Sequence, residues 1–186
     1  MSWLSRLLGR AELPAGFPGR LDPDERVVAA ATTGEGDPLV VTSHGLWLAE
    51  PDGGARRVGW HLVSKAAWQS GTLTVTEAAE VDVVEGAVLI TDQPPRRLRL
   101  ADPGRVPETV QARVESSIRS RHHRTLPGGG AWFVQRKVPG QDGIVLQVRP
   151  DPGTDDAALR RVAGTVAATI SRPQPPGGPD PRTGRR

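Results

Sequence analysis

The sequence predicts a mainly β protein of the α+β class. We expect a seven-stranded antiparallel barrel or sandwich capped by a helix, then a β-hairpin and a C-terminal helix. Two strand-like runs, 39–42 and 46–49, flank a three-residue connection that ends in glycine, which is typical of a hairpin. Residues 72–76 alternate leucine or valine with threonine, as in a strand with one buried face. Residues 159–170 carry apolar side chains at helical spacing.

Length and composition suit one compact domain with appendages. The 186 residues include no cysteine, which excludes disulfides, thiolate metal sites and a cysteine nucleophile. The start lacks the apolar core of a signal peptide, and no stretch has eighteen consecutive apolar residues, so we expect a cytoplasmic protein. The formal net charge is +3, and residues 172–186, with four arginines against one aspartate, contribute all of it. The basic character is therefore a weak indication of nucleic-acid binding.

The first twenty residues are predicted to form a short amphipathic segment and a linker rich in proline and glycine. Four apolar residues would make one narrow strip on a short helix: Trp3, Leu4, Leu7 and Leu8. One interpretation is a terminal turn that packs on the domain or frays. The other is a helix that contacts a membrane surface or a partner.

Roughly seven short strands follow in residues 21–126, which we expect to form the main domain. They are residues 27–31, the hairpin arms within 38–50, 57–68, 72–76, 81–84, 87–91 and 97–100. A helix should come next, because Val106, Val110, Val114, Ile118 and His122 recur every four residues. Its apolar stripe would cover an open end of the barrel.

Residues 127–171 are predicted to be a hairpin and helix packed on that domain. The hairpin joins 132–138 to 144–148, and Thr154 is a candidate N-cap for the last helix. Residues 172–186, rich in proline, glycine and arginine, should be a disordered tail.

Three segments together resemble the bacterial pleckstrin-homology-like (PH-like) pattern over about residues 21–124. They are Leu21-Asp-Pro-Asp-Glu-Arg-Val-Val-Ala-Ala, Leu39-Val-Val-Thr with Gly45-Leu-Trp-Leu, and Val58-Gly-Trp60 with Ala66-Ala-Trp68. The resemblance implies seven strands and one capping helix. It also implies a non-catalytic scaffold that binds a protein, another copy of itself or a membrane-associated assembly.

One departure from that family bears on ligands. Eukaryotic lipid-binding members hold inositol phosphates with basic residues around the loop that joins the first two strands. This chain has Glu35 and Asp37 in that loop, and two carboxylates would repel a phosphate. The sequence therefore disfavours phosphoinositide binding there.

No catalytic, cofactor-binding or metal-binding residues are predicted, and we expect no enzymatic activity. The segments Gly34-Glu-Gly36 and Gly128-Gly129-Gly130 lead into strands and lack the residues that bind phosphates. No Gly-x-Ser-x-Gly motif occurs. The four histidines have no acidic cluster at metal-ligand spacing near them, so solvated or packed imidazoles are the default interpretation.

Seven residues are candidates for binding a partner: Trp47, Trp60, Trp68, Arg119, Arg121, Arg124 and Trp132. The first three tryptophans could line one groove or fill the core. The arginine run could be a solvated helix end or a contact for an acidic partner, an anionic lipid or nucleic acid. No aromatic residue interleaves that run, which disfavours specific nucleic-acid recognition.

The leading hypothesis is a cytoplasmic, non-enzymatic binding or scaffold module that acts through protein partners or self-association. The alternative is an arginine-mediated accessory protein that binds nucleic acid or anionic membranes through residues 113–124 and the basic tail.

Overall fold

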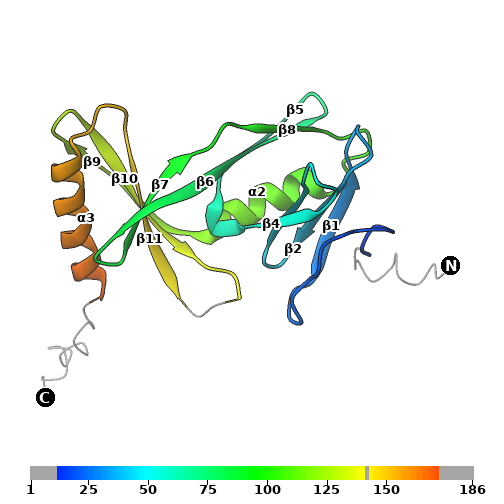
Figure 1. Cartoon of the computed structure of the whole chain (residues 1–186), viewed down its shortest axis with the longest axis horizontal. Helices are drawn as coiled ribbons and strands as arrows, with labels where there is room; N and C mark the ends of the chain where they lie inside the picture. Colours follow the sequence, from blue (N-terminus) through cyan, green and yellow to red (C-terminus); the bar gives the residue numbers. More distant parts are fainter. Residues whose placement is uncertain (1–11, 141–142, 172–186) are drawn as a thin grey trace, which may run out of the picture.

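The computed structural model describes residues 12–140 and 143–171, which form a strand-rich α+β protein (Figure 1). In chain order its elements are β1 Val27–Thr32, β2 Pro38–Thr42, β3 Gly45–Ala49, β4 Ala55–Gly59, the 3-10 turn η1 Trp60–Leu62, β5 Val63–Gln69, β6 Thr72–Val84, β7 Ala87–Asp92, β8 Arg96–Arg99, α2 Val106–Ser117, β9 Ile118–Leu126, β10 Gly129–Lys137, β11 Ile144–Pro150 and α3 Asp156–Ser171. The predicted α+β class is confirmed.

The strands form two separate sheets. The first is four-stranded in the order β1-β2-β3-β4, and the second runs β5-β6-β7-β11-β10-β9, with β8 also paired to β6. The predicted hairpins β2–β3 and β10–β11 are confirmed by their antiparallel registers.

The thirteen-residue strand β6 connects the two halves of the molecule (Figure 1). Its first half pairs with β5 and β8, and residues 78–84 pair with β7. The two separate strands predicted at 72–76 and 81–84 are therefore one strand, and its connecting residues carry too few apolar side chains to show this in the sequence. Tight turns at Ser70-Gly71 and Glu85-Gly86, with positive φ at each residue, reverse the chain on either side of it.

The first hydrophobic core lies where α2 packs against β5, β1 and β2. Val106, Val110 and Val114 are buried there, as their spacing predicted, among residues of the first sheet such as Leu39 and Leu46. Burial of each such side chain stabilises the fold by about 1.5–3 kcal/mol.

The predicted continuation of this helix to His122 is wrong. α2 ends at Ser117, because Ile118 already has extended backbone angles of φ −83° and ψ 119°, and residues 118–126 form β9. β9 pairs along its length with β10, and this backbone pairing overrides the four-residue spacing that continues through Ile118. The hydroxyls of Ser116 and Ser117 also bond carbonyls of the last helical turn, as serine does near helix ends.

The second hydrophobic core lies between α3 and one face of the sheet formed by β7, β11, β10 and β9. Leu159, Ala163 and Ala167 on α3 pack on residues such as Leu89 and Phe133. The predicted N-cap Thr154 is wrong: Asp155 accepts the hydrogen bond from the amide of Ala158 at 2.8 Å. Thr154 instead bonds both backbone groups of Gly130, which fastens the start of α3 to β10.

The predicted seven-stranded antiparallel barrel is not confirmed, because the strands divide between two sheets and the second sheet is mixed. β11 pairs with β7 in parallel, with Leu146 opposite Ala87 and Val148 opposite Leu89. The two strands are separated by β8, α2, β9 and β10, so the pairing depends on a long crossover that local sequence patterns do not encode. We call the strands β7, β11, β10 and β9 the mixed sheet.

Candidate functional site

The outer face of the first sheet is covered by the chain segment that precedes β1. Phe17 packs edge-on against Trp47 with ring centroids 5.5 Å apart, and the guanidinium of Arg57 lies 5.7 Å from the Trp47 ring. Trp47 is therefore buried under the N-terminal segment and presents no open aromatic surface.

Glu25 anchors that segment. Its side chain is fully buried and accepts hydrogen bonds from Thr42 Oγ1 at 2.5 Å, Trp47 Nε1 at 2.9 Å, Arg57 Nη1 at 2.6 Å and the Asp22 amide at 3.1 Å. Burial alone would raise the pKa of Glu25, but these four donors together hold that pKa below its ordinary value. Glu25 is thus a charged, fully hydrogen-bonded carboxylate inside the fold.

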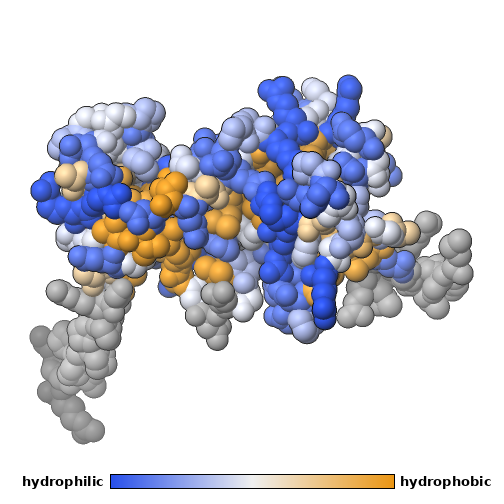
Figure 2. All heavy atoms as spheres, in the orientation of Figure 1, coloured by the Kyte–Doolittle hydropathy of each residue, from blue (hydrophilic) through white to orange (hydrophobic). Residues whose placement is uncertain are grey.

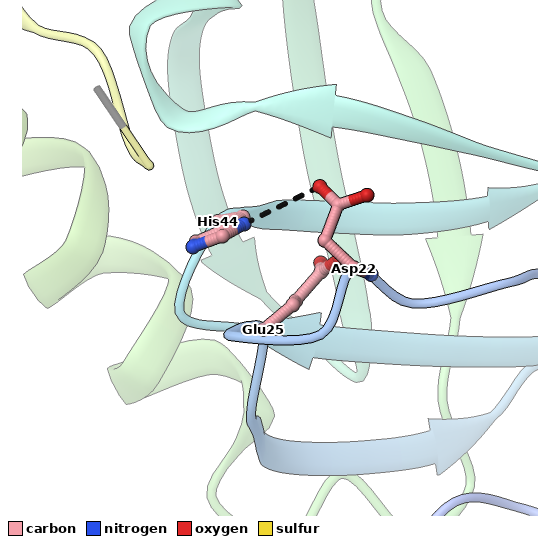
Figure 3. A group of neighbouring side chains, drawn as sticks. All are labelled: Asp22, Glu25 and His44. Carbon is pink, nitrogen blue, oxygen red and sulfur yellow. Dashed lines mark hydrogen bonds and ion pairs between the residues drawn. The ribbon is translucent and has the colours of Figure 1, made fainter.

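Asp22, Glu25 and His44 gather at the end of the β2–β3 hairpin (Figure 3). One ligand atom from each lies within 4.8 Å of the others, as a metal site would require. However, Arg57 Nη1 lies 2.6 Å from both Asp22 and Glu25, so a cation already occupies the place between the carboxylates. We interpret the group as a structural clasp rather than a metal site.

A different group of side chains lies on the mixed sheet. Strand alternation directs Phe133 toward α3, whereas Trp132, Val134 and Arg136 lie on the opposite face. α3 does not cover this face, and η1 and the end of α2 contact it at Arg136. We call this the open face. It contains a cavity of about 130 Å³ lined by Ser64, Ile90, Ile118, Arg121, Trp132, Val134, Arg136, Gln147 and Arg149.

Arg136 is the most unusual residue of this cavity, because it is a charged side chain that is only 6% exposed. Its Nη1 donates to the Ser117 hydroxyl at 2.8 Å and to the carbonyl of Trp60 at 3.2 Å. Its buried Nε has no hydrogen-bond partner, and no carboxylate of the described residues lies within ion-pair distance. Burial first, and then the positive charge of Arg149, lower the pKa of Arg136.

Two neighbours of Arg136 also connect the open face to residues of η1 and β5. Gln147 is buried and donates to the carbonyl of His61 at 2.8 Å. Arg149 donates to Ser64 Oγ at 3.1 Å and pairs with Asp92 at 3.2 Å. The charge of Arg149 is therefore compensated, unlike that of Arg136.

Trp132 and Arg121 form the exposed rim of the open face. Trp132 is half-buried and lies 5.1 Å from the ring of His123, which in turn pairs with Asp151 at 2.7 Å. Arg121 is exposed on the neighbouring strand, and Val134 is its register partner. Two residues predicted to bind a partner thus border one cavity.

The other predicted tryptophans are not brought together. Trp60 is buried in the first core, where its Nε1 donates to the carbonyl of Thr42 at 3.1 Å. Trp68 is 39% exposed on β5, and Trp47 lies beneath Phe17. The three residues do not line a common groove.

The predicted arginine run does not form one patch either. Because residues 118–126 are a strand, Arg121 lies at the open face, whereas Arg124 lies 5.7 Å from the ring of Phe133 on the α3 side. Arg119 is exposed at an irregularity in the β9–β10 register. The explanation of these charges as a helix end is wrong, since the helix has ended before them.

The histidines also do not converge. His122 and His123 are register partners of Phe133 and Trp132 and so lie on opposite faces of the sheet. His61 is half-buried, its Nδ1 lacks a partner, and its burial lowers its pKa. The structure places His44 in the clasp with Asp22.

Sequence reasoning missed Arg136, Gln147 and Arg149. A signal was present for Gln147 and Arg149, which alternate with apolar residues in a strand that the sequence predicted, whereas Arg136 stands between Gln135 and Lys137 and shows no such alternation. Their importance depends on which face α3 covers, and that requires the three-dimensional arrangement.

A second exposed feature is the end of β6. Residues 78–84 pair only with β7 among the described residues, and Val81 and Val83 are each 60% exposed. Figure 2 shows apolar side chains reaching the surface over the mixed sheet beside α3. Asp82, which pairs with Arg160, places charge on this strand, as is common where an edge is protected from pairing.

Some predictions fall outside the described residues: the amphipathic strip of Trp3, Leu4, Leu7 and Leu8, and the tail 172–186. Among the described residues, no helix has the length and apolar character needed to cross a bilayer. Comparison of the chain with family models, curated proteins and solved structures gives no match.

Proposed function

We propose that this protein is a non-enzymatic, PH-like binding module that associates with a protein partner or with a second copy of itself through the open face. One observation carries the proposal. The mixed sheet is covered by α3 on one side only, and its other side presents Trp132 and Arg121 at the rim of a cavity. Tryptophan and arginine are the side chains most enriched where protein interfaces gain their binding energy.

The PH-like part of the proposal is supported by the order of elements. A four-stranded antiparallel sheet is followed by β5, β6, β7 and β8, and then by α2, whose valines pack beside the first sheet. The Glu25 clasp gives a structural reason for a glutamate two residues before β1, where the family pattern has one. The extension of β6 into the mixed sheet departs from that pattern.

The alternative, an arginine-mediated accessory protein, has less support. Its predicted surface, residues 113–124, is divided by strand alternation, which separates Arg121 from Arg124. A phosphate backbone is bound best by cations that share one face.

Charge reversal at one rim position tests the proposed function. Proteins captured from the native cell extract by the unsubstituted protein would be compared with those captured by the variants Arg121→Glu and Arg124→Glu. The two substituted residues lie on opposite faces of β9. We expect Arg121→Glu to lose a specific partner that Arg124→Glu retains. Sedimentation at several concentrations would show whether that partner is a second copy. Equal capture by both variants would refute the open face as the binding surface.

A further inference from the structure

We propose that the cavity beside Arg136 is a binding site for one oxyanion group, which on the proposed function is a carboxylate presented by the protein partner. Arg136 would form the buried cationic floor of this site, with Arg121 at its mouth. The inference deepens the proposed function and rests on it for the source of the carboxylate.

The first argument is the uncompensated charge of Arg136. A buried ion is costly unless it is paired, and buried polar atoms in native proteins nearly always have a partner. Arg136 lines the cavity, is 6% exposed and has an Nε without an acceptor. An oxyanion in the cavity would supply the missing negative charge beside the guanidinium.

The second argument is the charge around the cavity. Asp92 lies nearby, but it already pairs with Arg149 at 3.2 Å and with Lys65 at 3.2 Å. Among the described residues, Arg121 has no carboxylate within ion-pair distance. The cavity therefore has a cationic excess from two arginines, and arginine binds a carboxylate through paired, charge-assisted hydrogen bonds.

The third argument is size. Sites for whole cofactors and drug-sized ligands usually measure roughly 300–1,000 Å³. A cavity of about 130 Å³ accommodates several water molecules or one small charged group. Ile90, Val134 and Trp132 form apolar walls, which strengthen a charge-assisted hydrogen bond by lowering the local dielectric.

A purely structural role for Arg136 accounts for only part of these observations. Its bonds to the Trp60 carbonyl and to Ser117 join three elements, η1, α2 and β10. A neutral side chain with the same donors would serve that purpose without a buried charge. If the role of Arg136 is purely structural, added anions should not shift the NMR signal of its side chain.

The test is an NMR titration of the full chain at pH 7 that follows the Nε–H signals of arginine. Sodium acetate and sodium phosphate would be added separately, with sodium chloride keeping the ionic strength constant. We expect a saturable shift of the Arg136 signal. Arg121→Ala should weaken the affinity roughly threefold or more, and Arg124→Ala on the other face should leave it unchanged.

Each outcome has a defined meaning. Saturable binding of acetate, at least as tight as that of phosphate, supports a carboxylate site. Much tighter binding of phosphate would overturn the carboxylate in favour of a phosphorylated ligand. An Arg136 signal that does not respond, or that responds equally in Arg121→Ala, overturns the site.

The oxyanion site and the proposed function can be refuted independently. If neither anion binds but Arg121→Glu still loses a partner, the oxyanion site is wrong and the open face remains the binding surface. If acetate binds and Arg121→Glu captures the same proteins as the full chain, the proposed function is wrong.

Discussion

Arg136 on β10 donates a hydrogen bond to the carbonyl of Trp60, which lies 76 residues earlier in the chain. This bond, together with the one from Gln147 to the neighbouring carbonyl of His61, fixes the turn η1 against the mixed sheet. The two halves of the molecule are thus joined by side chains donating to main-chain carbonyls as well as by the continuous strand β6.

Loss of the Gln147 side-chain amide should therefore destabilise the whole fold. Gln147→Leu leaves the partly buried carbonyl of His61 without its donor, which we expect to lower the free energy of unfolding by about 1 kcal/mol. Urea unfolding followed by tryptophan fluorescence measures the change. The control Gln111→Leu, at an exposed site on α2, should change stability by less than about 0.5 kcal/mol. Equal effects of the two substitutions would contradict the proposed role of Gln147.

The Glu25 clasp should make stability depend on pH in the acidic range. The pKa of Glu25 in the folded protein is depressed below its ordinary value of 4.5. Its contribution is therefore fully present above about pH 4.5 and is lost as the pH falls through the folded pKa. Urea unfolding between pH 7 and pH 3 measures this loss.

A matched pair of variants isolates Glu25 from other carboxylates. Glu25→Gln should lower the free energy of unfolding at pH 7 by about 1–3 kcal/mol. It should also reduce the further loss of unfolding free energy below pH 4.5. Glu35→Gln, in the exposed loop between β1 and β2, should leave both unchanged. A decline that persists unaltered in Glu25→Gln would show that other groups cause it.

His61 should contribute a second pH dependence at a higher pH. Burial lowers its folded pKa below the ordinary value of 6.5, so the unfolded chain takes up the proton first. Stability is then complete above about pH 6.5, declines as the pH falls from there to the folded pKa, and is constant below it. We expect the difference in unfolding free energy between pH 7.5 and pH 5.5 to shrink in His61→Leu but not in His122→Ala. The same difference in both variants would contradict this account.

The start of α3 offers a prediction about local structure. Asp155→Ala removes the side-chain acceptor for the Ala158 amide and should cost about 1 kcal/mol of stability. Asp156→Ala, which loses only an exposed pair with Arg160, should cost less. Thermal unfolding of the two variants compares them directly. A larger loss in Asp156→Ala would contradict Asp155 as the cap.

The elements that could be predicted from sequence are those defined by local patterns. Alternation around Leu73, the glycine at position 45 and the four-residue spacing from Val106 to Val114 each depend on neighbours a few residues away. The parallel pairing of β7 with β11 depends on residues 59 positions apart, as between Ala87 and Leu146, and no local pattern encodes it. The strand at 118–126 pairs with the next strand along the chain, β10, and was missed because the four-residue apolar spacing of the helix continues through Ile118.

The candidate site was predictable only in part. Trp132 and Arg121 stood out by residue type, and the structure places both at one cavity. Arg136 looks like an ordinary surface arginine in the sequence. Its burial arises only when η1 and Ser117, both distant along the chain, pack against it.

The central claim is that the open face binds the partner, and one comparison tests it most directly. Trp132→Ala and Trp68→Ala each remove one partly exposed tryptophan, the first from the open face and the second from β5. Equal thermal stability would establish that both variants are folded before the amount of captured partner is measured. The account predicts that Trp132→Ala loses the partner and Trp68→Ala retains it. Retention by Trp132→Ala, or loss only in Trp68→Ala, would contradict the account.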